Sequence, residues 1–173
     1  LMNPPIRDTE DKDTLWKRLK DGTIDCVVTD HAPHTLEAKS IGYPNAPAGM
    51  PGVETSLPLM LTHAIDGKCS VSDVVHWMCE MPAKVYNIEN KGSLVEGYDG
   101  DLTLVDLETR RTITDADTWT KVGWTPYAGF ELTGLPMWTI VDGIPVHSRS
   151  KEGSFKGNSL VKPGQTGRPL RFN

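Results

Sequence analysis

Cysteine is scarce in this sequence, and the few thiols have no motif spacing. Cys26, Cys69 and Cys79 are an odd number without a Cys-x-x-Cys pair, which favours reduced thiols in a cytoplasmic protein over a disulfide framework. No apolar run approaches the roughly 20 residues that span a bilayer, and no signal peptide is recognisable, so no membrane partner is expected. Positive charge is not in excess either, since the net charge is −5, and we expect no nucleic-acid partner.

The overall composition is that of a globular protein. The chain has 173 residues, of which 38% are hydrophobic and 24% charged, enough for one good core or a little more. Its first residues, Leu-Met-Asn-Pro-Pro, read like the middle of a protein. We therefore expect the chain to be a segment of a longer one.

The first half alternates helical and strand patterns, as in an α/β fold. A helix is expected over 8–20, with Thr9 or Asp13 as its N-cap and Asp21-Gly22 at its end. The continuous apolar run Cys26-Val27-Val28 predicts a strand over 24–29 that is buried on both faces of a parallel sheet. A long loop over 32–52 and three helices follow, over 53–64, over 72–81 with Ser72 as its cap, and over 82–86.

After residue 88 the pattern changes to short β-like runs separated by glycines. Strands are expected over 102–105, 111–113 and 138–141, and Asp142-Gly143 predicts a hairpin turn into 144–146. The tail from Arg149 is expected to be extended, with Pro169-Leu170 docking against the body. The pattern thus predicts two domains, an α/β part over 1–88 and a small β-unit with its tail over 89–173.

Polar residues that could carry chemistry begin where the expected strand ends. Asp30 follows it directly, and a carboxylate there can bind a metal or act as a general base. It can equally cap the following turn, because aspartate is common at strand ends. His31 and His34 lie on either side of Pro33, which excludes a simple helix, so their spacing alone does not indicate zinc.

Two further stretches are rich in residues suited to binding. Two prolines stiffen the run from Asn3 to Arg7; the asparagine can pair with an amide edge, and the arginine can grip a carboxylate or form a structural ion pair. The small residues of Ala48-Gly49 let the backbone approach a ligand. Glu54 is expected to stabilise the start of the next helix, with a direct role in the site as the alternative.

These stretches together resemble one family. "NPPIR", "TDHAPH" and "AGMPGVETSLPLML", in this order and spacing, resemble the C-terminal half of class I dihydroorotases, which are amidohydrolase-superfamily enzymes of pyrimidine biosynthesis. The later "GSLVEGYDGDLTLVD" resembles the superfamily's small β-sandwich domain. The resemblance implies the last strands of a TIM-like (β/α)8 barrel over 1–88, with part of the β-sandwich over 89–173.

The resemblance also implies an activity and a set of site residues. The family hydrolyses the cyclic amide of dihydroorotate reversibly to N-carbamoyl-L-aspartate at a centre of one or two zinc ions, and such a metal lowers the pKa of bound water to about 7. Asp30 matches the aspartate that ligates metal and moves the proton. Substrate-binding positions are matched by Asn3 and His34, and through the backbone by Ala48 and Gly49. His31 and Arg7 match supporting positions.

One departure from the family is large. Its His-x-His pair, its bridging lysine or acid, its two later histidine ligands and its substrate arginine have no counterpart among these residues, and none of the five histidines lies in a His-x-His motif. The metal centre cannot be built from Asp30 alone. We therefore expect the chain to need the missing N-terminal part of the barrel, and to be inactive by itself.

Two alternatives remain open at this stage. The chain could belong to a non-catalytic dihydroorotase-like subunit that supports aspartate transcarbamoylase, although a pseudo-enzyme is expected to lose Asp30 or its neighbours. It could also belong to another cyclic amidohydrolase such as an allantoinase, against which His34 and the "NPPIR" stretch argue. Expected partners are the small substrate, a second copy of the protein or aspartate transcarbamoylase.

Overall fold

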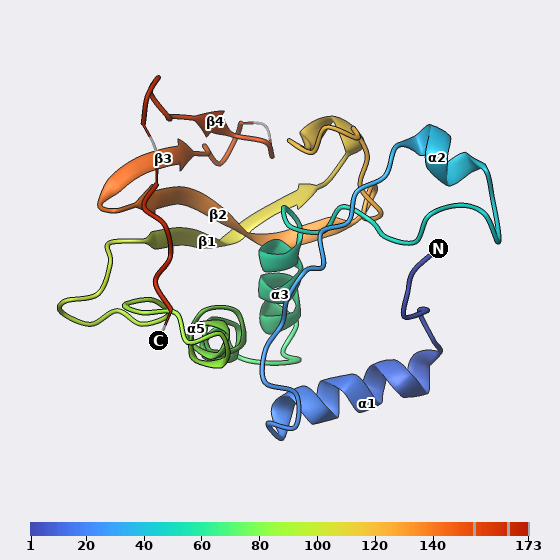
Figure 1. The fold of residues 1–173 in the computed structure, drawn as a ribbon, viewed down its shortest axis with the longest axis horizontal. Helices are drawn as coiled ribbons and strands as arrows, with labels where there is room; N and C mark the ends of the chain where they lie inside the picture. Colours follow the sequence, from blue (N-terminus) through green and yellow to red (C-terminus); the bar gives the residue numbers. More distant parts are fainter. Residues whose placement is uncertain (154, 166, 173) are drawn as a thin grey trace.

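The chain folds into a group of helices beneath a small antiparallel sheet (Figure 1). The structure is a computed structural model, and it describes residues 1–173 except 154, 166 and 173. No helix of this described part is both long and apolar enough to cross a membrane. The elements, in chain order, are α1 (Thr9–Lys20), α2 (Leu36–Ser40), α3 (Ser56–Ile65), α4 (Val71–Val75), the π-helix η1 (His76–Glu80), α5 (Met81–Val85), β1 (Leu102–Thr112), the 3-10 helix η2 (Asp115–Asp117), β2 (Glu131–Val141), β3 (Ile144–Ser148) and β4 (Asn158–Ser159).

The first helix was placed correctly by the sequence, but its cap was not. Asp8 is the N-cap of α1, and its carboxylate accepts from the Asp11 N–H at 3.1 Å. Neither Thr9 nor Asp13 does so, because the cap must be extended and lie three residues before the amide that it receives. The α4 helix shows the same shift: Ser70, not Ser72, forms a capping box with Asp73.

The predicted strand over 24–29 is not formed. Its main-chain hydrogen bonds run from Ile24 N–H to the Arg18 carbonyl and from Val27 N–H to the Trp77 carbonyl, both at 3.0 Å, and they form no sheet ladder. A strand is defined by its neighbours, and in the described part the nearest approach to one is a single parallel bridge between His31 and Met50. The expected parallel sheet is therefore absent from the described residues, and the sheet that exists is antiparallel.

The sheet is built from β1, β2, β3 and β4 in sequence order. The two strands expected over 102–105 and 111–113 are one strand, β1, whose register with β2 shifts between Asp106 and Arg110. The Asp142-Gly143 turn is confirmed, and both residues have the positive φ, 53° and 76°, that a tight hairpin requires. The described strands form one layer, so the expected β-sandwich is not confirmed. The tail contacts the body at Arg171, just after the predicted Pro169-Leu170 pair, because Glu89 N–H donates to the Arg171 carbonyl at 2.9 Å.

Helix α3 joins the two cores of the molecule. Its residues Met60 and Leu61 belong to the helical core, and Leu59 packs against the core of the sheet. The contact between α3 and β2 is close, because a Cβ at Gly134 would lie only 2.8 Å from the Leu61 Cβ. Beside this point the Thr62 hydroxyl accepts from Thr133 N–H at 2.9 Å. The buried members of the helical core are Leu19, Met60, Leu61, Val74 and Trp77, and those of the sheet core are Ile113, Leu132, Leu135 and Phe155.

Candidate functional site

The stretch that contains Asp30 lies beside the loop over 46–52. Ala32 N–H donates to the Met50 carbonyl at 3.2 Å, and His31 bridges Met50 in parallel. Gly49 makes this approach possible, because a Cβ there would lie 2.6 Å from the Ala32 carbonyl oxygen. Two of the three stretches singled out from the sequence are therefore in direct contact.

Asp30 is exposed and has a φ of 41°, in the left-handed region that aspartate and asparagine tolerate better than most residues. Asp30 directly precedes the bridge between His31 and Met50. The following helix, α2, has Thr35 as its N-cap.

His31 faces the loop through one ring nitrogen. Its Nδ1 accepts from Gly52 N–H at 3.1 Å and from Val53 N–H at 3.3 Å. Because Nδ1 is an acceptor, the proton of the neutral imidazole lies on Nε2. His31 therefore holds the end of the loop.

His34 contacts the same loop further along. Its Nε2 lies 3.1 Å from the Ala48 carbonyl oxygen, so this nitrogen donates. Its own carbonyl accepts from the Trp124 indole N–H at 2.8 Å. The structure thus brings His34 and Ala48 together, as two of the positions matched to substrate binding.

The first stretch of the chain joins this group through its backbone. Leu1 C=O accepts from Gly49 N–H at 3.1 Å. Asn3 and Arg7 are both exposed, and no hydrogen bond of the described residues ties either side chain to Asp30 or His34. The structure therefore places the start of this stretch beside the loop, but it does not bring these two side chains to the aspartate.

Two residues with clear contacts were missed or misread in the sequence. Lys39, on α2, donates to main-chain carbonyl oxygens of the loop. Glu54 does not cap α3 with its side chain; its carboxylate accepts from Trp119 N–H at 2.7 Å and from Thr120 N–H at 2.9 Å. The Glu54 contacts join segments far apart in the sequence, and neither residue carries a local sequence signal for its contacts.

The residues that the structure describes do not complete a metal centre. Within the described residues no group of three histidine, cysteine, aspartate or glutamate side chains could hold an ion. Asp30 offers one carboxylate, while His31 Nδ1 and His34 Nε2 are engaged with the backbone. The residues present therefore do not fit a whole metal site.

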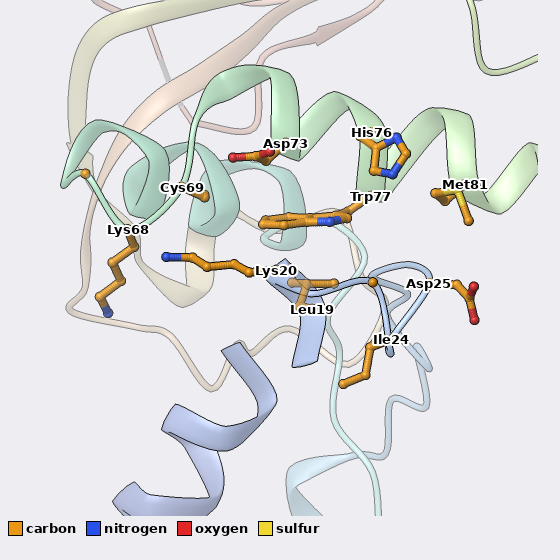
Figure 2. Close-up of a pocket in the computed structure, with 12 residues that line it drawn as sticks. Leu19, Lys20, Ile24, Asp25, Lys68, Cys69, Asp73, His76, Trp77 and Met81 are labelled. Atoms are coloured by element: carbon orange, nitrogen blue, oxygen red, sulfur yellow. The ribbon is translucent and has the colours of Figure 1, made fainter. Parts of the chain in front are cut away.

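A separate hollow of about 660 Å³ lies between the end of α1 and the α4–η1 segment (Figure 2). Two of its polar side chains are engaged: the Asp73 carboxylate accepts from Ser70 N–H at 2.7 Å in the capping box of α4, and His76 Nδ1 lies 2.8 Å from Glu80 Oε2. Burial and the charge of Asp73 raise the pKa of the Cys69 thiol, which disfavours the thiolate. The candidate site remains the one around Asp30.

The sequence matches the amidohydrolase family over residues 8–143. It is 44% identical over 152 residues to a dihydroorotase of Anoxybacillus flavithermus, covering 87% of this chain and 35% of that protein. It is also 39% identical over 168 residues to a dihydroorotase of Pyrococcus furiosus, covering 96% of this chain and 39% of that protein. The chain thus spans little more than a third of the length of these relatives.

Solved structures of hydantoinases resemble the fold. The L-hydantoinase (dihydropyrimidinase) of Arthrobacter aurescens superposes with a TM-score of 0.80 at 35% identity, over 93% of this chain and 35% of that one. The dihydropyrimidinase of Brevibacillus agri superposes with a TM-score of 0.82 at 25% identity, over 94% of this chain and 38% of that one. These neighbours imply a TIM-barrel-like hydrolase fold, and the resemblance to dihydroorotases expected from the motifs is confirmed by the relatives. Amidohydrolases are generally metal-dependent. This chain belongs to the amidohydrolase family.

Proposed function

We propose that this chain is the C-terminal part of a dihydroorotase, which hydrolyses the cyclic amide of dihydroorotate reversibly to N-carbamoyl-L-aspartate in pyrimidine biosynthesis. The observation that carries the proposal is the identity of about 40% to proteins named dihydroorotase over most of the chain. The contact between the Asp30 stretch and the 46–52 loop supports it, because both contain residues assigned to this chemistry by resemblance.

In this proposal the residues of the chain have separate roles in metal binding, proton transfer and substrate binding. Asp30 supplies one ligand of a zinc site whose other ligands belong to the rest of the barrel. Its carboxylate also takes the proton of the attacking water and delivers it to the amide nitrogen that leaves, as a general base and then acid. Asn3, His34 and the backbone of Ala48 and Gly49 bind the substrate.

The remainder of the barrel is proposed to pack on an apolar hollow of about 450 Å³ next to this site. Val28 and Phe130 line it, yet their side chains are 61% and 54% exposed. Large apolar side chains exposed together mark a surface that another segment covers. We also propose that the chain divides into two domains near residue 88 and that the second contributes to a β-sandwich. The full-length protein is proposed to associate with a second copy or with aspartate transcarbamoylase.

A second candidate is another cyclic amidohydrolase, a hydantoinase or an allantoinase. The observation in its favour is the match to hydantoinase structures, at up to 35% identity for the examples given. The two candidates differ in the ring that is opened, so turnover of dihydroorotate, hydantoin and allantoin by the full-length protein distinguishes them.

The Asp30→Asn variant of the full-length protein tests the role of the aspartate. Asparagine keeps the size and tolerates the positive φ, but it cannot accept the proton. We expect turnover of dihydroorotate to fall by about 100-fold or more, the range of a lost general base. Asp25→Asn, an exposed aspartate of the same segment, is the matched control and should leave turnover unchanged. Near-normal turnover by Asp30→Asn, or by the 173-residue chain alone, would contradict the proposal.

A further inference from the structure

Lys39 makes an unusual set of contacts for a lysine on a five-residue helix. Its Nζ donates to the carbonyl oxygens of Pro47 at 2.9 Å, of Gly49 at 2.9 Å and of Leu1 at 3.2 Å. An ammonium group has three N–H donors, so these three acceptors satisfy it fully. The side chain is half-buried, and all three acceptors belong to the backbone. Lys39 thus ties two distant segments to α2.

Two of the three oxygens, those of Pro47 and Gly49, belong to the part of the loop assigned to substrate binding. Pro47 and Gly49 flank Ala48, whose own carbonyl turns to His34 Nε2. Lys39 therefore fixes the carbonyl groups on both sides of Ala48, while His34 fixes the Ala48 carbonyl itself.

A further bond closes the arrangement. Gly49 N–H donates to Leu1 C=O at 3.1 Å, and the same oxygen accepts from Lys39. The loop cannot shift at Gly49 without breaking bonds to the ammonium and to the first segment at once. Gly49 is also pressed against Ala32, two residues after Asp30. Lys39 thus contributes, together with the His31 and His34 contacts, to the position of the loop relative to the aspartate.

We propose that Lys39 is a positioning residue that fixes the backbone of Ala48 and Gly49 for substrate. This inference rests on the proposed function, since it assumes that the loop binds the substrate of the same site. Lys39 does not touch the reacting atoms. It acts on binding, through the placement of a loop that is preorganised before the substrate arrives.

The test compares Lys39→Met, Lys39→Arg and Lys84→Met in the full-length protein. Methionine keeps the length and removes the donors; arginine keeps the charge, but its planar fork cannot direct donors at three converging oxygens. Lys84 is the matched control, because it is an exposed lysine on another five-residue helix, α5. We expect KM for dihydroorotate to rise about 10- to 100-fold in Lys39→Met, the range of lost charged hydrogen bonds. It should rise less in Lys39→Arg and not at all in Lys84→Met, with kcat within about threefold throughout.

Several outcomes overturn the inference. They are an unchanged KM in Lys39→Met, a fall in kcat at constant KM, an equal effect of Lys84→Met, or failure of both Lys39 variants to fold, which would make the lysine a folding residue only. If the unaltered protein does not turn over dihydroorotate, the proposed function fails instead. Hydrogen exchange then decides about Lys39: faster exchange of the Gly49 amide in Lys39→Met than in Lys84→Met supports the placement, and equal exchange refutes it.

Discussion

Replacing Gly134 by alanine should destabilise the protein at the joint between α3 and β2. Gly134 is buried and has a φ of 87°, and an added Cβ would lie 2.8 Å from the Leu61 Cβ and 3.2 Å from the Ile65 Cδ1. The left-handed backbone costs a non-glycine residue about 1–2 kcal/mol. Overpacking against a buried leucine costs a further ~1–3 kcal/mol. We therefore expect the free energy of unfolding to fall by about 2–5 kcal/mol.

A second glycine separates the two contributions. Gly129 has the same φ of 87°, but nothing lies within 4 Å of its added Cβ, and it is exposed. Gly129→Ala should therefore carry the backbone cost of about 1–2 kcal/mol alone. Urea unfolding of the full-length protein, followed by tryptophan fluorescence, measures both variants against the parent. Equal losses for the two variants would refute the contact between Gly134 and Leu61, and with it the packing of α3 on the sheet.

Two further predictions concern α3 itself. Thr62→Val should lower the free energy of unfolding by about 1–3 kcal/mol, because the Thr133 N–H that donates to the hydroxyl would lose its partner. Thr62→Ser keeps the hydroxyl and should lower the free energy of unfolding by less, as measured by urea unfolding. Equal losses in the two variants would be inconsistent with the hydrogen bond. Burial, helped by the charge of Lys68, lowers the pKa of His63 below its ordinary value of 6.5. The unfolded chain then binds the proton more readily, so this contribution is complete above about pH 6.5 and is lost as the pH falls from there toward the folded pKa. His63→Phe, which keeps a ring against Trp16, should show a weaker loss over that range, and an identical pH profile would argue against the assignment.

The features predicted correctly from the sequence were those encoded locally. The Asp142-Gly143 turn was recognised because a tight hairpin needs two residues that tolerate positive φ. The α1 helix was recognised from its cap candidates and from Asp21-Gly22 at its end, although several acidic or hydroxyl side chains near its start made the cap ambiguous. Such signals need no information about the rest of the molecule.

The features missed were those that depend on distant partners. The apolar run at Val27 and Val28 is typical of a buried strand, but a ladder requires neighbouring strands, and the described residues supply none there. Glu54 was assigned to the helix that it precedes, whereas its partners are 65 and 66 residues away. Lys39 carried no signal for its contacts, because a lysine is usually exposed and three backbone oxygens have no sequence signature.

In the candidate site, the sequence identified the segments more reliably than the contacts within them. It selected the stretches around Asp30 and Ala48 by residue type and resemblance, and the structure brings these two together. It did not reveal that His31 and Lys39 hold the loop from opposite ends. Those contacts follow from the path of the chain in space.

The position of Glu54 has a consequence for how this protein can be divided. Its carboxylate, between the 46–52 loop and α3, receives two amides from the segment that follows β1. A cut after residue 88 would follow the change of sequence pattern, yet it would strip these amides from Glu54 and uncover Leu61. The N-terminal part, residues 1–88, would keep every residue that the resemblance assigns to the site. It would lose part of the packing and hydrogen bonding that hold these residues in place. Domain exchange with relatives should therefore transfer the sheet and the helical segment together.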